Sequence, residues 1–155
     1  MVDHLIAALS FIGLILSLIV HLLSVFSVDV SQFFPSAWLL HLGAFVVFAP
    51  LVFYAKKDSN GNSLIFPHAP EWVKTASISL FTYVVFNFLY FAISMEGSPS
   101  IEEGKYILHD HGRLIRELTA EEYHRFVAKE LRGFSGHWLI FYFAPFAYFT
   151  FRSKK

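Results

Sequence analysis

Four long stretches of this chain contain no Asp, Glu, Lys or Arg. They cover residues 5–28, 36–55, 75–95 and 134–151. A hydrocarbon core of about 30 Å is crossed by about 20 helical residues, because each residue adds about 1.5 Å along the helix. Each stretch is long enough to cross a bilayer, and the last is the shortest. We therefore predict an all-α membrane fold, a bundle of four transmembrane helices.

The composition agrees with this prediction. The chain is 55% hydrophobic and 15% charged, whereas a soluble domain carries about 25% charged residues. Little sequence is left outside the spans for a soluble domain, so residues 1–155 are expected to form one polytopic membrane domain in contact with the lipid bilayer. A formal net charge of zero argues against nucleic acid as a partner. The absence of Cys excludes disulfides, thiolate metal sites and thiol nucleophiles.

Three unequal connections join the predicted spans. The first, 29–35, is short, so the first two helices should form an antiparallel hairpin. The second contains a polar turn at 58–63, followed by an apolar, proline-broken stretch at 64–72 that suits the headgroup level. The third connection, 96–133, is the longest and begins with a linker at 96–100. We expect this third connection to be an extramembrane insertion.

The insertion has its own local signals. Residues 105–118 read as a β-hairpin with Gly112 at the positive-φ position of the turn. Thr119 and Glu122 form a capping box, which predicts a helix start. That helix is expected to be amphipathic and to end at Gly133. Its apolar face would contain Tyr123, Phe126, Val127 and Leu131.

Lys and Arg residues near the span ends bear on orientation. With four spans, both termini and the 56–74 connection share one side, and basic residues lie close to the spans on that side. The basic residues of the 96–133 insertion are more dispersed. We predict cytoplasmic termini, with the insertion on the opposite side. The arrangement resembles that of small bacterial membrane proteins, which implies a bacterial cytoplasmic membrane but no activity.

Two of the predicted spans carry a face of small and polar residues. In the first span this face is formed by Ser10, Gly13, Ser17, His21, Ser24 and Ser27. In the third span it is formed by Ser79, Thr82, Tyr83, Asn87, Tyr90 and Ser94. Small residues let helix backbones approach closely. We therefore expect the small residues of the first span to be helix-packing residues, and the first and third spans to be partners.

Polar groups at similar depth form a candidate intramembrane site. Its members are His21, His41, Asn87, Tyr90 and His137. They could form hydrogen bonds between helices, bind haem or a metal through His21, His41 and His137, or serve a proton or substrate path. Isolated histidines without supporting carboxylates are a weak pattern for metal ligation, which favours the hydrogen-bond interpretation and leaves any cofactor unknown.

Two prolines are expected to bend their helices. Pro50 follows Phe48-Ala49 in the second span, and Pro145 follows Phe143-Ala144 in the fourth. Each proline removes one backbone donor, which weakens the helical hydrogen-bond ladder.

The sequence contains no recognisable catalytic motif, neither H-E-x-x-H nor G-x-S-x-G, P-loop or Rossmann fingerprint. An enzyme is therefore not the expectation. We predict a protein that acts by helix–helix association, as a homo-oligomer, an accessory subunit, or an inhibitor or immunity-type partner of a larger membrane protein. The alternatives are a haem- or metal-binding redox protein and an oligomeric pore or carrier.

Overall fold

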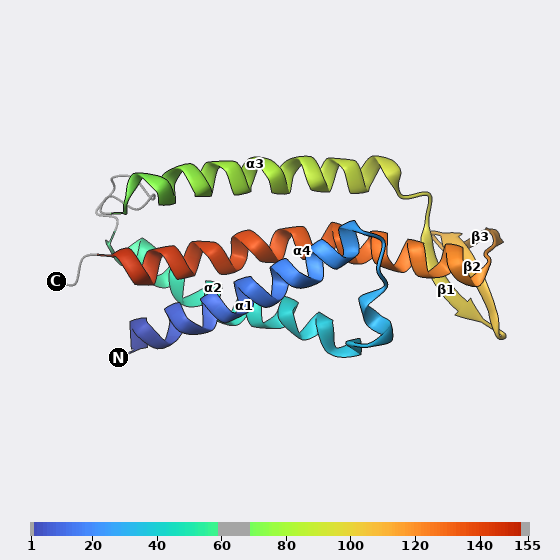
Figure 1. Ribbon diagram of the computed structural model, residues 1–155, viewed down its shortest axis with the longest axis horizontal. Helices are drawn as coiled ribbons and strands as arrows, with labels where there is room; N and C mark the ends of the chain where they lie inside the picture. The colour runs from blue at the N-terminus through green and yellow to red at the C-terminus, as the bar shows by residue number, and fades with distance from the viewer. Residues whose placement is uncertain (1, 59–68, 153–155) are drawn as a thin grey trace.

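The computed structural model describes residues 2–58 and 69–152. Its helices are α1 (Val2–Val25), α2 (Leu39–Asp58), α3 (Glu71–Ser94) and α4 (Ala120–Phe151). Its strands are β1 (Ser98–Glu102), β2 (Lys105–Asp110) and β3 (Arg113–Glu117). The helices run along the long axis, and the sheet lies beyond the end of α3 (Figure 1). Asp58, the first residue of the predicted polar turn, ends α2, whereas residues 59–63 of that turn and residues 64–68 of the apolar stretch lie outside the described residues.

Within the described residues, three helices are long and apolar enough to cross a membrane: Val2–Val25, Pro35–Ala55 and Glu71–Ser94. They match the first three predicted spans, and they make this a multi-pass membrane protein by helix length and composition. The segment predicted as the fourth span is not among them. Its Ser, Gly, His, Trp and Tyr residues lower its mean hydropathy although it carries no charge.

The prediction that the amphipathic helix ends at Gly133 is wrong. The 32 residues of α4 form one helix, which contains both this segment and the predicted fourth span. The capping box is confirmed: the Thr119 hydroxyl accepts from the Glu122 N–H, and the Glu122 carboxylate accepts from the Thr119 N–H. At Gly133 the Phe91 ring occupies the space of a side chain, since a Cβ would lie 2.5 Å from it. Close packing against Phe91 thus explains why a glycine occupies position 133 inside a continuous helix.

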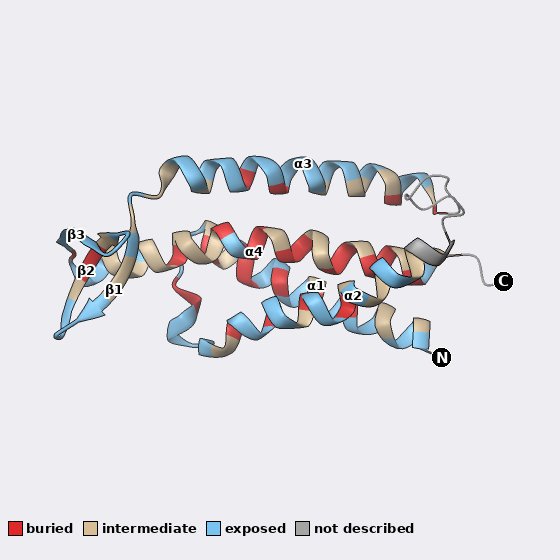
Figure 2. Cartoon of the chain, turned by 180° about the vertical axis from the view of Figure 1, so that it is seen from behind, coloured by how far each residue is buried: buried red, intermediate tan, exposed pale blue. Residues whose placement is uncertain are grey.

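Helix α4 is the central helix of the bundle. Buried residues follow α4 along its length, whereas α3 is mostly exposed (Figure 2). The other three helices all pack against α4, and α1 also contacts α2. Within the described residues, α3 makes no comparable contact with α1 or α2. The expected pairing of the first and third spans holds in part: the His21 and Tyr83 side chains are in contact, whereas both helices pack mainly against α4.

The small-residue face of α1 lies against α4. Its residues Ser10, Gly13, Ser17, His21 and Ser24 are all buried. Ser27, also expected on this face, is exposed and lies beyond the end of α1 at a φ of 62°. A Cβ on Gly13 would lie 2.1 Å from the Tyr142 ring, so only glycine allows this approach. The Tyr142 hydroxyl crosses to α2 and donates to the Leu40 carbonyl over 2.8 Å. One aromatic side chain thereby ties α4 to both α1 and α2.

The predicted hairpin is present, but it belongs to a three-stranded antiparallel sheet of order β1-β2-β3. The expected linker is wrong from Ser98 onward, because that segment pairs with β2. Both turns place two residues at positive φ: Glu103 and Gly104 at 49° and 79°, and His111 and Gly112 at 49° and 80°. Such turns suit two-residue hairpin loops. The first was missed because its leading residue is Glu, not a usual turn residue.

The α1–α2 connection is fixed by Asp29. One carboxylate oxygen accepts from the Ser31 N–H over 2.9 Å, starting a 3-10 turn at Val30–Gln32. The other oxygen lies 2.7 Å from Nδ1 of His124 on α4. Burial by itself raises the pKa of Asp29, but the hydrogen bonds from Ser31 and His124 bring the pKa below its ordinary value. The ionised carboxylate therefore joins this connection to α4.

Both prolines lie inside helices, Pro50 in α2 and Pro145 in α4. The bend expected at each stays a prediction.

Candidate functional site

A connected set of polar side chains joins α1, α4 and α3. We call it the polar seam. It consists of His21 on α1, Ser135 and Arg132 on α4, and Tyr83, Asn87 and Tyr90 on α3. Its hydrogen bonds run between helices, so it holds together segments that are far apart in the sequence.

His21 is at the α1 end of the seam and is 2% exposed. Its Nε2 lies 2.5 Å from the Tyr83 hydroxyl, and its Nδ1 lies 2.8 Å from Oγ of Ser135. One arrangement of protons satisfies every group. Tyr83 donates to Nε2, Nδ1–H donates to Ser135, and Ser135 donates to the Arg132 carbonyl. A neutral imidazole thus bridges α3 and α4.

Asn87 and Arg132 form the α3 end of the seam. The Asn87 amide donates to the Arg132 carbonyl, and the Arg132 guanidinium donates to the Asn87 side-chain oxygen, each over 3.2 Å. The guanidinium also lies 4.4 Å from the centre of the Tyr90 ring, a cation–π contact. Asn87 is seven residues before Ser94, the last residue of α3, so this contact lies about 10 Å below that helix end.

Gly136 allows the two ends of the seam to meet. A Cβ at this position would lie 2.5 Å from the Asn87 amide nitrogen and 3.6 Å from Cε1 of His21. Both side chains therefore rest against bare backbone of α4. A larger residue here would separate α3 from the other helices.

Arg132 supplies a positive charge at this depth. In the described part of the chain it forms no ion pair with a carboxylate, and its contacts are the neutral Asn87 and the face of Tyr90. A charge in the apolar part of a membrane is costly and commonly marks a functional or structural site. The seam is thus the place where this bundle departs most from a simple apolar interface.

His41 and His137 lie away from the seam. His41 accepts from Trp138 Nε1 over 2.9 Å, whereas His137 bonds the Gly133 carbonyl over 3.1 Å and packs edge-on against Phe88. Of the five predicted site residues, His21, Asn87 and Tyr90 are brought together and these two are not. The side chains of His21, His41 and His137 therefore do not converge on one point where they could bind the same metal ion or haem. Among the described residues, no group of three or more His, Asp or Glu side chains is placed to hold a metal ion.

Four participants were missed by sequence reasoning: Tyr83 as a site residue, Arg132, Ser135 and Gly136. Arg132 lies just before the predicted start of the fourth span, and the helix was expected to stop at Gly133. Continuing the helical period through that glycine would have placed Arg132, Ser135 and Gly136 on one face. The helical period was thus the sequence signal that could have predicted the positions of these α4 residues.

The Ser135–His21 contact joins a hydroxyl to a possible base, the combination used by serine nucleophiles. Here the two side chains are 0% and 2% exposed. A substrate would have to displace packed helices to reach the hydroxyl. The geometry therefore supports a structural hydrogen bond between helices.

Comparison with protein-family models, curated proteins and solved structures finds no match to this chain.

Proposed function

We propose that this multi-pass membrane protein acts without catalysis, by associating with another membrane helix through the outward face of α3. The partner is a second copy of the chain or a larger membrane protein of which this chain is a subunit or inhibitor. The exposed, unpaired hydroxyls on α3 support this proposal most strongly.

Ser79 and Thr82 carry these hydroxyls. Both residues are exposed, and neither side chain has a hydrogen-bond partner in the described part of the chain. Nearby Thr75 and Ser77 instead donate to carbonyls of their own helix, over 3.1 and 2.8 Å. Polar groups facing lipid cost free energy, and small hydroxyl residues are common where membrane helices associate. A partner helix would give Ser79 and Thr82 the contacts they lack.

Helix α3 also has free surface for a partner. Its exposed aromatic residue Phe86 is 67% accessible and lies one turn beyond Thr82 on the same side. Because α3 packs mainly against α4 and its outward face is free, a partner could contact it without disturbing the α1–α2–α4 core.

We further propose that α4 is the fourth membrane-crossing helix. The three outer helices shield the apolar half of α4 from lipid. A lower mean hydropathy than that of α1, α2 and α3 is therefore compatible with a stable position of α4 in the bundle. With α4 crossing, the termini share one side, proposed to be cytoplasmic, and residues 96–133 lie on the other side of a bacterial cytoplasmic membrane.

A photo-crosslinking amino acid tests the association. It would replace Phe86 on α3 and, as the matched control, Ile12 on α1, which is 55% exposed. In native membranes, position 86 should give a defined protein adduct and position 12 should not. Mass spectrometry would identify the adduct as a second copy or a distinct partner. Crosslinks to lipid alone at position 86, with a monomer in mild detergent, would contradict the proposal.

A further inference from the structure

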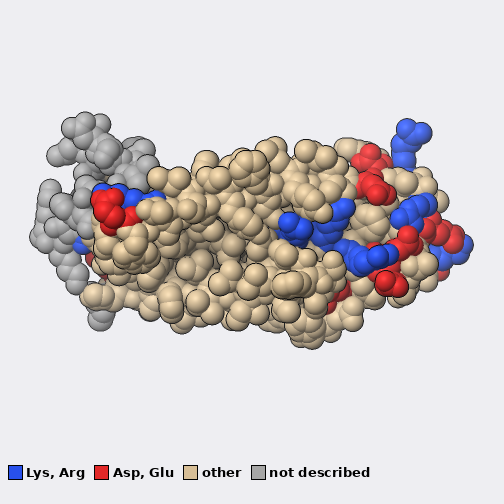
Figure 3. Space-filling view, turned by 45° about the horizontal axis from the view of Figure 1, so that its top comes forward, with Lys and Arg blue, Asp and Glu red and all other residues tan. Residues whose placement is uncertain are grey.

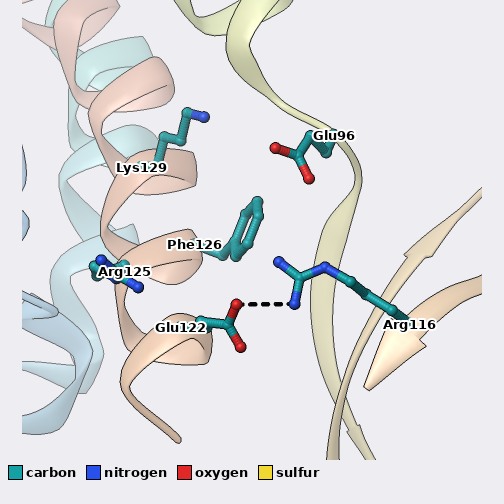
Figure 4. Close-up of a pocket in the computed structure, with 6 residues that line it drawn as sticks. All are labelled: Glu96, Arg116, Glu122, Arg125, Phe126 and Lys129. Atoms are coloured by element: carbon teal, nitrogen blue, oxygen red, sulfur yellow. Dashed lines mark hydrogen bonds and ion pairs between the residues drawn. The ribbon is translucent and has the colours of Figure 1, made fainter. Parts of the chain in front are cut away.

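A charged cleft of about 220 Å³ opens where α3 ends and α4 continues toward the sheet. It lies between α4 on one side and the segment after α3, with β3, on the other (Figure 4). Its lining residues are Glu96, Arg116, Glu122, Arg125, Phe126 and Lys129.

The cleft lies at the boundary of the apolar surface. The Lys129 ammonium donates to the carbonyl of Ser94, the last residue of α3, and the neighbouring Ile93 is 85% exposed. Lys and Arg side chains gather directly beside the long uncharged middle of the molecule (Figure 3). If α3 crosses the membrane, this is the level of the phospholipid headgroups.

The charges of the cleft are of both signs. Arg116 is paired with Glu122 over 2.9 Å, which leaves other guanidinium donors of Arg116 open. The hydrogen bond to the Thr119 backbone and the bond from Arg116 keep the pKa of Glu122 below its ordinary value, so this pair stays ionised. Glu96 extends from the opposite wall toward Lys129, and the described structure contains no ion pair for it (Figure 4).

We propose that this cleft binds the headgroup of an aminophospholipid of the phosphatidylethanolamine class. Arg116 and Lys129 hold the phosphate, and the Glu96 carboxylate accepts hydrogen bonds from the ammonium. Arg125 adds positive potential at the rim. The methylene carbons between phosphate and amine lie over the Phe126 ring.

The carboxylate distinguishes this ligand from the other abundant phospholipids. A phosphatidylglycerol headgroup has no cation for Glu96, so the Glu96 carboxylate would face the bound lipid without a partner. A phosphatidylcholine headgroup has a cation but no N–H to donate, so the hydrogen bond to Glu96 is lost.

Native mass spectrometry of the purified chain in nanodiscs of defined lipid mixtures tests this assignment. The wild type should retain phosphatidylethanolamine in preference to phosphatidylglycerol and phosphatidylcholine. Arg116→Gln and Lys129→Gln should each weaken retention about tenfold, the effect of one charge-assisted hydrogen bond. Lys105→Gln is the matched control, because Lys105 lies on β2 and pairs with Glu117 outside the cleft.

Glu96→Gln is the deciding variant, since Glu96 is exposed and the described structure gives it no ion pair to lose. It should abolish the preference for phosphatidylethanolamine and raise retention of phosphatidylglycerol. Equal retention of the three lipids by the wild type, or an unchanged preference in Glu96→Gln, would overturn the proposal. So would displacement of the lipid by soluble O-phosphoethanolamine at equal concentration, because that result would indicate a soluble ligand.

Discussion

The two main interfaces of α4 differ in kind. Against α1, α4 meets a face of small residues, and Tyr142 lies directly over Gly13. Against α3, it meets the polar seam and the Phe91 ring, and α3 has no other comparable contact within the described residues. The first interface resembles a permanent core. The second leaves most of a helix available, which is what an association surface requires.

The largest expected effect is at the α1 interface. Gly13→Leu places a side chain where the Tyr142 ring lies and should lower the free energy of unfolding by about 3 kcal/mol, because this packed site has no room. The change in the free energy of unfolding can be measured by unfolding the protein in mixed micelles with an increasing fraction of dodecyl sulfate. Ile12→Val, on the lipid-facing side of the same helix, is the control and should change stability by less than about 1 kcal/mol. Equal effects of the two variants would contradict a tightly packed α1–α4 face.

At the α3 interface, Gly136→Val should cost about 2 kcal/mol by displacing Asn87 and His21. Hydrogen exchange then tells the two interfaces apart. Exchange should rise in α3 more than in α2, because the substitution disturbs Asn87 and His21, through which α3 contacts α4 and α1, whereas α2 keeps its contacts with both helices. A uniform rise across all four helices would show that α3 is not the more weakly attached element.

Removing the imidazole at the centre of the polar seam should have a smaller effect. His21→Leu leaves the Tyr83 and Ser135 hydroxyls without this partner and should cost about 1–2 kcal/mol. Tyr83→Phe removes one of the two bonds and should cost about 1 kcal/mol. In the double variant the two losses should not add, because they share one hydrogen bond. Simple additivity in the unfolding assay would argue against the His21–Tyr83 contact.

The smallest expected effect is a pH dependence outside the membrane. Because the folded pKa of Asp29 is below its ordinary value of about 4, its carboxylate stabilises the folded chain above that pH. This stabilisation, less than about 1 kcal/mol, is lost as the pH falls through the folded pKa. Hydrogen exchange near His124 should then rise below pH 4 in the wild type. In Asp29→Asn it should already be raised at neutral pH and change little on acidification.

The sequence predicted the parts of the fold that depend on local signals. Charge-free length located α1, α2 and α3, and the Thr119–Glu122 capping box located the start of α4. The end of that helix was mispredicted because a glycine is a common stop signal, and only the Phe91 ring shows why Gly133 is helical. Whether α1 faces α3 or α4 is a tertiary property that helical periodicity alone does not contain.

For the candidate site, residue type and depth predicted the involvement of His21 and Asn87 but not their partners. His41 has the same chemistry and a similar predicted depth, yet it bonds Trp138 on a different side of α4. Depth specifies position along the membrane normal, whereas the position around the bundle depends on packing. For the same reason the sequence did not predict the role of Arg132, whose long side chain reaches Asn87 from outside the predicted span.

Helix α4 is the central helix of the bundle and is proposed to be its fourth membrane crossing. The natural chain has no Cys, so single cysteines can be introduced at Glu103, in the exposed β1–β2 turn, and at Lys155. A membrane-impermeant maleimide applied to intact cells and to inverted vesicles reports the side of each cysteine. We predict labelling of position 103 only from outside and of position 155 only from inside. Labelling of both from the same side would show that α4 does not cross the membrane.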